Sequence, residues 1–172
     1  LKDYTAAFEV RAKSSRADFL VINGETKCFE IKSKIDTLKR LEKQSCDYKD
    51  VFEFNTIVTD QKHLSIVKDI IPDYYGIWSF EGDEKVEFRK AQKSVHLDSS
   101  SQLDLMTKRE RKIYFGLSEI DQILLDFSKD SINEILKGVL KDRYKDRWLF
   151  VKSNWNKILP IDLQFFYNTN IN

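Results

Sequence analysis

Two short apolar runs on either side of Asn23-Gly24 place the strongest local constraint on the fold of this chain. The runs cover residues 18–22 and 27–32, and Asn-Gly is a frequent connection in tight β-hairpins because both residues tolerate positive φ. Both faces of the hairpin are mostly apolar, as in strands at the centre of a sheet that is covered on two sides. The sequence therefore predicts a central β-hairpin, with Asp18, Glu30 and Lys32 gathered at the end away from the turn.

The register of this hairpin decides whether Asp18 and Glu30 share one face of the sheet. If the numbers of opposing residues sum to an even number, as a three-residue loop over 23–25 provides, the two carboxylates lie on the same face. A two-residue turn would place them on opposite faces. Lys32 shares the face of Glu30 in either case, because side chains two residues apart in a strand point the same way.

A carboxylate pair beside a lysine suits metal-dependent cleavage of a phosphodiester. Hard divalent cations prefer carboxylate oxygens, and a bound cation screens the phosphate charge and lowers the pKa of an attacking water. The lysine would offset the repulsion between two buried carboxylates and stabilise negative charge that develops on the phosphate. The alternative interpretation is a charged hairpin end that forms only a structural ion pair.

The order Asp18, then Glu30-Ile31-Lys32 after a hairpin, resembles the PD-(D/E)XK motif of the restriction-endonuclease-like nuclease superfamily, with Ala17 in place of the proline. The resemblance implies that Asp18, Glu30 and the carbonyl of Ile31 bind Mg2+ or Mn2+, and that Lys32 acts with the water. It covers roughly residues 8 to 60.

The segment after the hairpin extends this resemblance. Helical spacing of Leu38, Leu41, Gln44 and Tyr48, together with a possible capping box from Ser33 to Asp36, predicts a helix over 36–49. Gln44 and Tyr48 match the Q-x-x-x-Y motif of the RecB-like branch, and their amide and hydroxyl groups can hold phosphate oxygens or ligating waters. The alternative is ordinary packing on a helix surface.

Further candidates flank the motif. Residues 3–14 are expected to form an amphipathic helix, on which Glu9 matches the additional acidic ligand that many superfamily members carry; without the resemblance, Glu9 is equally a solvated helix residue. Arg16, Lys34 and Arg40 are the candidate nucleic-acid contacts. The superfamily core has the order α-β-β-β-α-β, and only two strands are predicted here before the Gln44 helix.

The remaining pattern completes an α/β chain. A strand is expected over 52–59, a helix capped by Asp60 with its apolar stripe reaching Ile71, a second hairpin from 77–80 and 86–88, and a loop or linker over 93–102. Capping boxes at Ser118 and Ser131 predict later helices. The predicted fold is a restriction-endonuclease-like mixed sheet flanked by helices, with a nuclease-like core over 1–92 and a helical C-terminal subdomain over 103–172.

The composition excludes some classes of protein function but does not identify one. The 29 basic and 28 acidic side chains nearly cancel, so net charge says nothing about nucleic acid, and basic runs such as 108–112 are usually solvated helix faces. The absence of a long apolar run argues against a membrane span and favours a cytoplasmic location. His63 on a helix surface and His96 in a loop are too few for a zinc site.

Two cysteines, Cys28 and Cys46, are expected to be reduced and buried. The C-terminal aromatic residues, including Trp148 and Trp155, are expected to pack the helical subdomain, with base stacking as the alternative. The favoured function is a Mg2+- or Mn2+-dependent nuclease that acts on DNA in preference to RNA, with a targeting protein as a further partner. The rivals are a catalytically inactive nuclease fold that binds nucleic acid or protein, and a structural module that docks another protein through its aromatic C-terminus.

Overall fold

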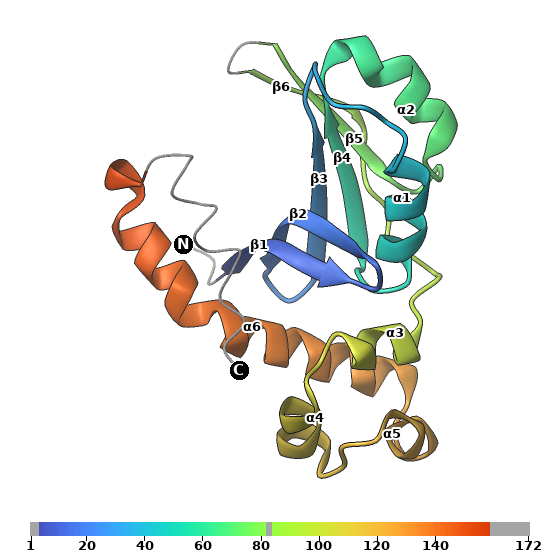
Figure 1. Ribbon diagram of the computed structural model, residues 1–172, viewed down its shortest axis with the longest axis vertical. Coiled ribbons are helices and arrows are strands. Elements are labelled where there is room, and N and C mark those ends of the chain that lie inside the picture. Colours follow the sequence, from blue (N-terminus) through green and yellow to red (C-terminus); the bar gives the residue numbers. More distant parts are fainter. Residues whose placement is uncertain (1–3, 82–83, 159–172) are drawn as a thin grey trace.

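The structure is a computed structural model that describes residues 4–81 and 84–158 (Figure 1). Its centre is a six-stranded mixed sheet in which the strands follow chain order: β1 (Thr5–Ala12), β2 (Ser15–Ile22), β3 (Thr26–Lys32), β4 (Phe54–Thr59), β5 (Gly76–Glu81) and β6 (Glu84–Arg89). The β3–β4 and β4–β5 pairs are parallel, and the other pairs are antiparallel. Helices flank this sheet, which confirms the predicted α/β class.

The hairpin of β2 and β3 has the register that the carboxylate pair requires. Phe19 pairs with Phe29 and Ile22 with Thr26, so opposing residue numbers sum to 48 and the connection is the three-residue loop 23–25. Gly24 adopts a φ of 90°, a region that favours glycine. Continued by one residue, the register places Asp18 opposite Glu30, which satisfies the condition set by the sequence.

The N-terminal segment is a strand, so the predicted helix over 3–14 is wrong. β1 pairs with β2 from Thr5↔Ile22 to Ala12↔Ser15, and the pairing is interrupted only at Glu9, whose φ is 53°. The positive φ shifts the alternation, so that Ala7 and Val10 are both buried although they stand three residues apart. This strand is the third one before the Gln44 helix, where only two are predicted from the sequence.

Two helices after the hairpin pack on one face of the sheet. These are α1 (Leu41–Lys49) and α2 (Leu64–Ile70), the second preceded by the short η1 (Gln61–His63) (Figure 1). α1 begins five residues later than expected, because Ser33 donates from its N–H and its Oγ to the Asp36 carboxylate in a turn instead of capping the helix. Asp60 accepts from the N–H of Lys62 and caps η1, as predicted.

The C-terminal helices are α3 (Ser99–Asp104), α4 (Lys108–Phe115), α5 (Ile120–Asp126), α6 (Lys129–Ser153) and η2 (Trp155–Lys157). The loop expected over 93–102 is therefore partly helical, with Asp98 as N-cap of α3. The boxes expected at Ser118 and Ser131 are wrong: α5 has no side-chain cap, and Ser128 caps α6. No helix within the described residues is long and apolar enough to cross a membrane. The boundaries 1–92 and 103–172 stay a prediction.

A buried carboxylate joins the sheet to the C-terminal helices. Glu53 has no exposed surface, and its Oε2 accepts from the N–H of Thr26 at 2.8 Å. Its Oε1 accepts from Asn133 Nδ2 of α6 at 2.9 Å and forms ion pairs with Lys93 at 3.0 Å and Lys137 at 3.6 Å. Because every one of these partners is a donor or a cation, the charge of Glu53 is well compensated.

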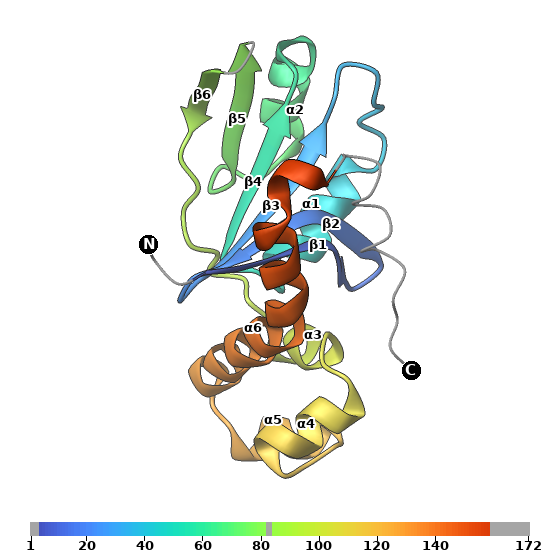
Figure 2. The same cartoon turned by 90° about the vertical axis from the view of Figure 1, so that its left-hand side faces the viewer.

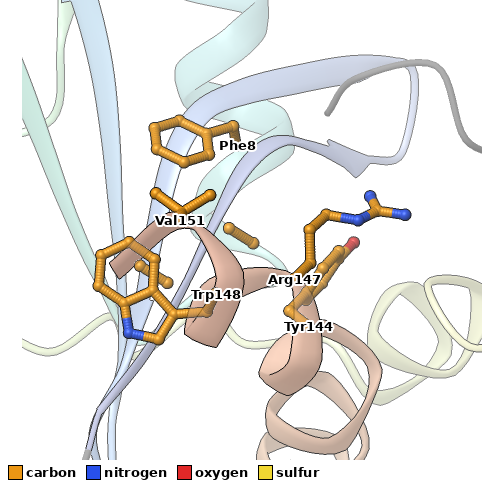
Figure 3. A pocket seen from close by; sticks show the side chains of 7 residues that line it. Phe8, Tyr144, Arg147, Trp148 and Val151 are labelled. Carbon is orange, nitrogen blue, oxygen red and sulfur yellow. The ribbon is translucent and has the colours of Figure 1, made fainter. Parts of the chain in front are cut away.

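α6 also packs across β1, where Trp148 is 7% exposed and its ring centroid lies 5.4 Å from that of Tyr4. Figure 3 shows the small pocket at this contact, lined by Phe8 of β1 and by Tyr144, Arg147, Trp148 and Val151 of α6. Packing, the favoured interpretation, is confirmed for Trp148, whereas Trp155 is exposed. The aromatic residues after 158 lie outside the described part of the chain.

Candidate active site

Glu30 lies on the face of β3 that α1 covers. It is 2% exposed, and Lys32 on the same face is 5% exposed, whereas Ile31 between them points to the other side and is half exposed. This alternation follows from the two-residue period of a strand. α1 runs along that face and carries Gln44 and Tyr48 one turn apart, so both side chains reach the same carboxylate.

Three side chains hold the Glu30 carboxylate. Its Oε1 accepts from Lys32 Nζ and from Gln44 Nε2, both at 2.6 Å, and its Oε2 lies 2.7 Å from the Tyr48 hydroxyl. Lys32 Nζ also donates to Gln44 Oε1 at 3.0 Å. Gln44 and Tyr48 therefore both contact the candidate carboxylate, and the helix-surface alternative for these two residues is wrong.

The Tyr48 hydroxyl is fully buried and also lies 2.7 Å from the main-chain carbonyl of Arg16 on β2. Its single hydrogen can be donated to one of these two acceptors at a time. Burial and the nearby Glu30 charge both raise the pKa of Tyr48 far above its ordinary value. The hydroxyl therefore remains protonated and acts as a donor that links α1 to both strands of the hairpin.

Asp18 completes the site from β2. Its Oδ2 accepts from the N–H of Ile31 at 2.6 Å, and the side chain is partly buried. Burial raises the pKa of Asp18 to about 6, with a further contribution from the Glu30 charge that the hydrogen bond from Ile31 only partly opposes. The two carboxylates thus interact electrostatically, and the negative charge of Asp18 is incompletely compensated.

Glu9 lies on β1, not on the helix expected for it. The β1–β2 register places it opposite Asp18, and its carboxylate is 3.8 Å from the Arg16 guanidinium. Burial raises the pKa of Glu9, Arg16 lowers it, and Glu30 raises it, with a net rise. Glu9 therefore belongs to the electrostatic surroundings of the site, and its role as a metal ligand stays a prediction.

Asp18 and Glu30 offer carboxylate oxygens of the kind that divalent cations take as ligands. Within residues 4–81 and 84–158, no three His, Cys, Asp or Glu side chains are grouped so as to hold a metal ion. A carboxylate offers about four acceptor positions. Three hydrogen bonds to Glu30 and one to Asp18 leave acceptor positions on both, and oxygen ligands of this kind are those that Mg2+ prefers. The Ile31 carbonyl is the third ligand that the PD-(D/E)XK resemblance implies.

The three candidate nucleic-acid contacts, Arg16, Lys34 and Arg40, are all exposed. Arg16 stands two residues before Asp18, and its guanidinium faces Glu9. Lys34 and Arg40 lie in the segment between β3 and α1, where the Lys34 carbonyl accepts from Lys62 Nζ at 3.4 Å. Contact of these three residues with nucleic acid stays a prediction.

Two residues outside the candidate site, His63 and Cys46, differ from expectation in their burial. His63 is 7% exposed, so its predicted place on a helix surface is wrong, and its buried Nε2 has no hydrogen-bond partner among the described residues. A single histidine in an otherwise amphipathic segment gave no signal of this burial. His96 is exposed in a loop and Cys28 is buried, as predicted, whereas Cys46 is exposed on α1.

Comparison with known proteins gives one family. The chain matches the family model described as "Bacteriophage P4 protein cII" over residues 3–167. It is 30% identical over 131 residues to Protein cII of Enterobacteria phage P4, an alignment that covers 74% of this chain and 47% of the relative. The chain thus spans about half the length of the curated relative it matches.

One solved structure is also similar, a protein of unknown function from Silicibacter pomeroyi. The match has 17% sequence identity and a TM-score of 0.43, and it covers 59% of this chain and 68% of the other.

Proposed function

The chain belongs to the bacteriophage P4 protein cII family, and we propose that it is a metal-dependent nuclease whose site is built on Asp18, Glu30 and Lys32. The observation that carries this proposal is the convergence of side chains from three elements on one buried carboxylate. β3 supplies Glu30 and Lys32, α1 supplies Gln44 and Tyr48, and β2 supplies Asp18. The PD-(D/E)XK motif that the sequence resembles uses Asp18, Glu30 and Lys32, and its RecB-like branch adds Gln44 and Tyr48.

In the proposed reaction, Asp18, Glu30 and the Ile31 carbonyl hold Mg2+ or Mn2+. The bound cation would screen the phosphate charge and lower the pKa of an attacking water. Lys32 would place its ammonium beside Glu30, where it would stabilise the negative charge that builds up on the phosphate. Gln44 and Tyr48 fix the Glu30 carboxylate by hydrogen bonds, so that its remaining acceptor positions have one orientation.

The substrate of the proposed nuclease is nucleic acid, with DNA favoured over RNA, in the cytoplasm. The exposed Arg16, Lys34 and Arg40 would bind phosphates along the rim of the site, without reading sequence. The proposal also includes a protein partner that directs the nuclease to its target.

A catalytically inactive nuclease fold that binds nucleic acid or protein is the second candidate, and one observation favours it. Lys32 Nζ is hydrogen bonded to both Glu30 and Gln44, so the ammonium already neutralises the carboxylate internally. A site of this kind is stable without any cation. The nuclease proposal requires Asp18, the less compensated carboxylate, for cleavage, whereas the inactive fold would cleave no substrate.

Cleavage of plasmid DNA and of single-stranded RNA with Mg2+ or Mn2+ tests the proposal. We expect cleavage that EDTA abolishes and that Asp18→Asn reduces by about 1,000-fold or more, because this substitution removes one ligand charge while Asn can still accept from the Ile31 N–H.

Glu119→Gln, which alters an exposed carboxylate beside Lys108, is the matched control and should cleave like the wild type. Full activity of Asp18→Asn, or cleavage that survives EDTA, would refute the proposed mechanism. No cleavage of any substrate by a protein that Mn2+ stabilises would favour the inactive candidate.

A further inference from the structure

One face of the sheet has no helix over part of its area. α1 and α2 cover the opposite face, and on this side α6 packs against β1 and β2, where Trp148 and Val151 contact Ala6, Phe8 and their neighbours. Figure 2 shows β4, β5 and β6 turned toward the viewer with no helix in front of them. Within the described residues, no helix covers this side of β4, β5 and β6.

The open face is apolar and aromatic at its centre. Strand register assigns to it the side chains opposite to those of Glu30 and Ile57. Ile31 and Phe80 are 52% and 51% exposed, and the other members of this open sheet face are partly exposed: Phe29, Phe54, Val58 and Trp78. The Phe29 and Trp78 ring centroids lie 5.1 Å apart across β4. The six side chains therefore form one continuous patch over β3, β4 and β5.

The strands that carry this patch are the parallel ones. Parallel strands are almost always covered on both faces, and their side chains are correspondingly apolar on both sides. A row of exposed Ile, Phe and Trp side chains on three parallel strands thus indicates a missing second layer, because large exposed apolar patches mark sites of association.

The charges at the rim of the patch are balanced. Lys27 Nζ lies 3.1 Å from Glu25 and 5.8 Å from the Phe54 ring centroid, and Lys85 Nζ lies 3.5 Å from Glu87. The Lys85 ammonium reaches in from β6 over the Trp78 ring, with Nζ 4.0 Å from the ring centroid, so one positive charge also lies over the aromatic part of the patch. A nucleic acid would meet one carboxylate for each ammonium here, whereas its binding sites carry an excess of positive charge. In a two-fold interface residue i of one copy contacts residue j of the other and j contacts i, so a face that carries ammonium and carboxylate groups in equal number can pair opposite charges with its own copy.

We propose that the open sheet face of β3, β4 and β5, with Phe29, Trp78 and Phe80 at its centre, binds the same face of a second copy of this chain. The two sheets pack face to face around a two-fold axis, and the rim lysines and glutamates of one copy pair with those of the other. Glu30 lies on the opposite side of β3, so both candidate active sites stay open in the dimer. The inference does not depend on the nuclease proposal.

Sedimentation equilibrium on the full chain, from 1 to 200 µM, tests this dimer. The wild type should be dimeric, and Phe80→Glu should raise the dimer dissociation constant by about 30-fold or more, because it puts a charge into the apolar centre of the interface. Phe88→Glu is the matched control: Phe88 belongs to the same hairpin and is 40% exposed, but its ring contacts Lys68 of α2. This control should sediment like the wild type.

Circular dichroism must show that both variants are folded. If Phe80→Glu does not fold, Lys85→Glu, which leaves two carboxylates at the exposed rim, replaces it and should also weaken the dimer. A monomeric wild type at 200 µM would overturn the proposal, as would a folded Phe80→Glu that dimerises like the wild type. Binding of a labelled single-stranded oligonucleotide that only Phe80→Glu abolishes, with a monomeric wild type, would instead assign the face to nucleic acid.

Discussion

Glu30, on β3, and Glu53, the residue before β4, are both almost fully buried carboxylates, yet their surroundings differ in charge. Each accepts a hydrogen bond from a side-chain amide, Gln44 or Asn133, and each lies beside an ammonium group. Glu53 meets two ammonium groups. Glu30 meets one, Lys32, and has a second carboxylate, Asp18, on the neighbouring strand.

The pKa values follow this difference. Burial alone would raise the pKa of Glu53, but hydrogen bonds from Thr26 and Asn133 and the charges of Lys93 and Lys137 hold it below 4.5. In contrast, burial and the Glu30 charge raise the pKa of Asp18 to about 6. A buried carboxylate whose partners are all donors stabilises the fold, whereas a pair with surplus negative charge is suited to bind a cation.

The largest expected effect on stability comes from Glu53→Gln. This change removes the buried charge that faces both Lys93 and Lys137 and leaves Lys137 paired with Glu134 alone, so we expect the free energy of unfolding to fall by about 3 kcal/mol. Urea denaturation at pH 7 measures it. Glu119→Gln, at an exposed position, should unfold at the same urea concentration as the wild type. If Glu53→Gln is as stable as this control, Glu53 is not the structural link described here.

Lys32→Ala should affect the other site in a different way. Lys32 donates to Glu30 and Gln44, and in the proposed reaction it stabilises charge on the phosphate, so we expect turnover to fall about 100-fold. Binding of Mn2+ should remain within a few-fold of the wild type. Single-turnover cleavage and Mn2+ titration on the same preparation separate the two effects. Unchanged turnover would remove Lys32 from the reaction.

The residues of the site were predictable because each depends on a short-range rule. Asn23-Gly24 indicated a hairpin, the strand period put Glu30 and Lys32 on one face, and one helical turn brought Gln44 and Tyr48 together. The sequence does not decide whether the hairpin loop has two or three residues, and the structure shows three. All five side chains predicted from the sequence to be catalytic lie at one place, and their catalytic role stays a prediction.

The failures have physical causes as well. The helix over 3–14 is predicted because Tyr4, Ala7, Phe8 and Ala12 have a helix-like spacing. In the structure this segment is a strand whose alternation shifts at Glu9, where φ is positive, so that Ala7 and Val10 are both buried. Glu53 was overlooked because its partners Lys93 and Asn133 come from distant parts of the chain. A single charged residue between Phe52 and Phe54 was the only local signal of its burial.

Asp18→Asn should produce a smaller change in stability, and of opposite sign to that of Glu53→Gln. Without metal, the Asp18 and Glu30 carboxylates repel each other, so neutralising one should stabilise the protein in EDTA by up to about 1 kcal/mol. Thermal unfolding in EDTA at pH 7 measures this difference. A loss of stability comparable to that of Glu53→Gln would place Asp18 among the structural carboxylates.

The smallest effect concerns pH. Because the pKa of Glu53 is lowered in the folded state, its contribution to stability is complete above about pH 4.5 and is lost as the pH falls through the folded-state pKa. The difference in stability between the wild type and Glu53→Gln should therefore narrow below pH 4.5. Urea denaturation of both proteins between pH 3 and pH 7 measures it. A difference that does not change with pH would contradict the assigned ionisation.

Titration calorimetry with Mn2+ tests most directly whether Asp18 and Glu30 form a cation site. The wild type should bind Mn2+, Asp18→Asn should bind it at least about 10-fold more weakly, because one ligand charge is gone, and Glu119→Gln should bind it like the wild type. A wild type that is folded and binds no Mn2+ would contradict the account. So would an Asp18→Asn variant that binds Mn2+ as tightly as the wild type.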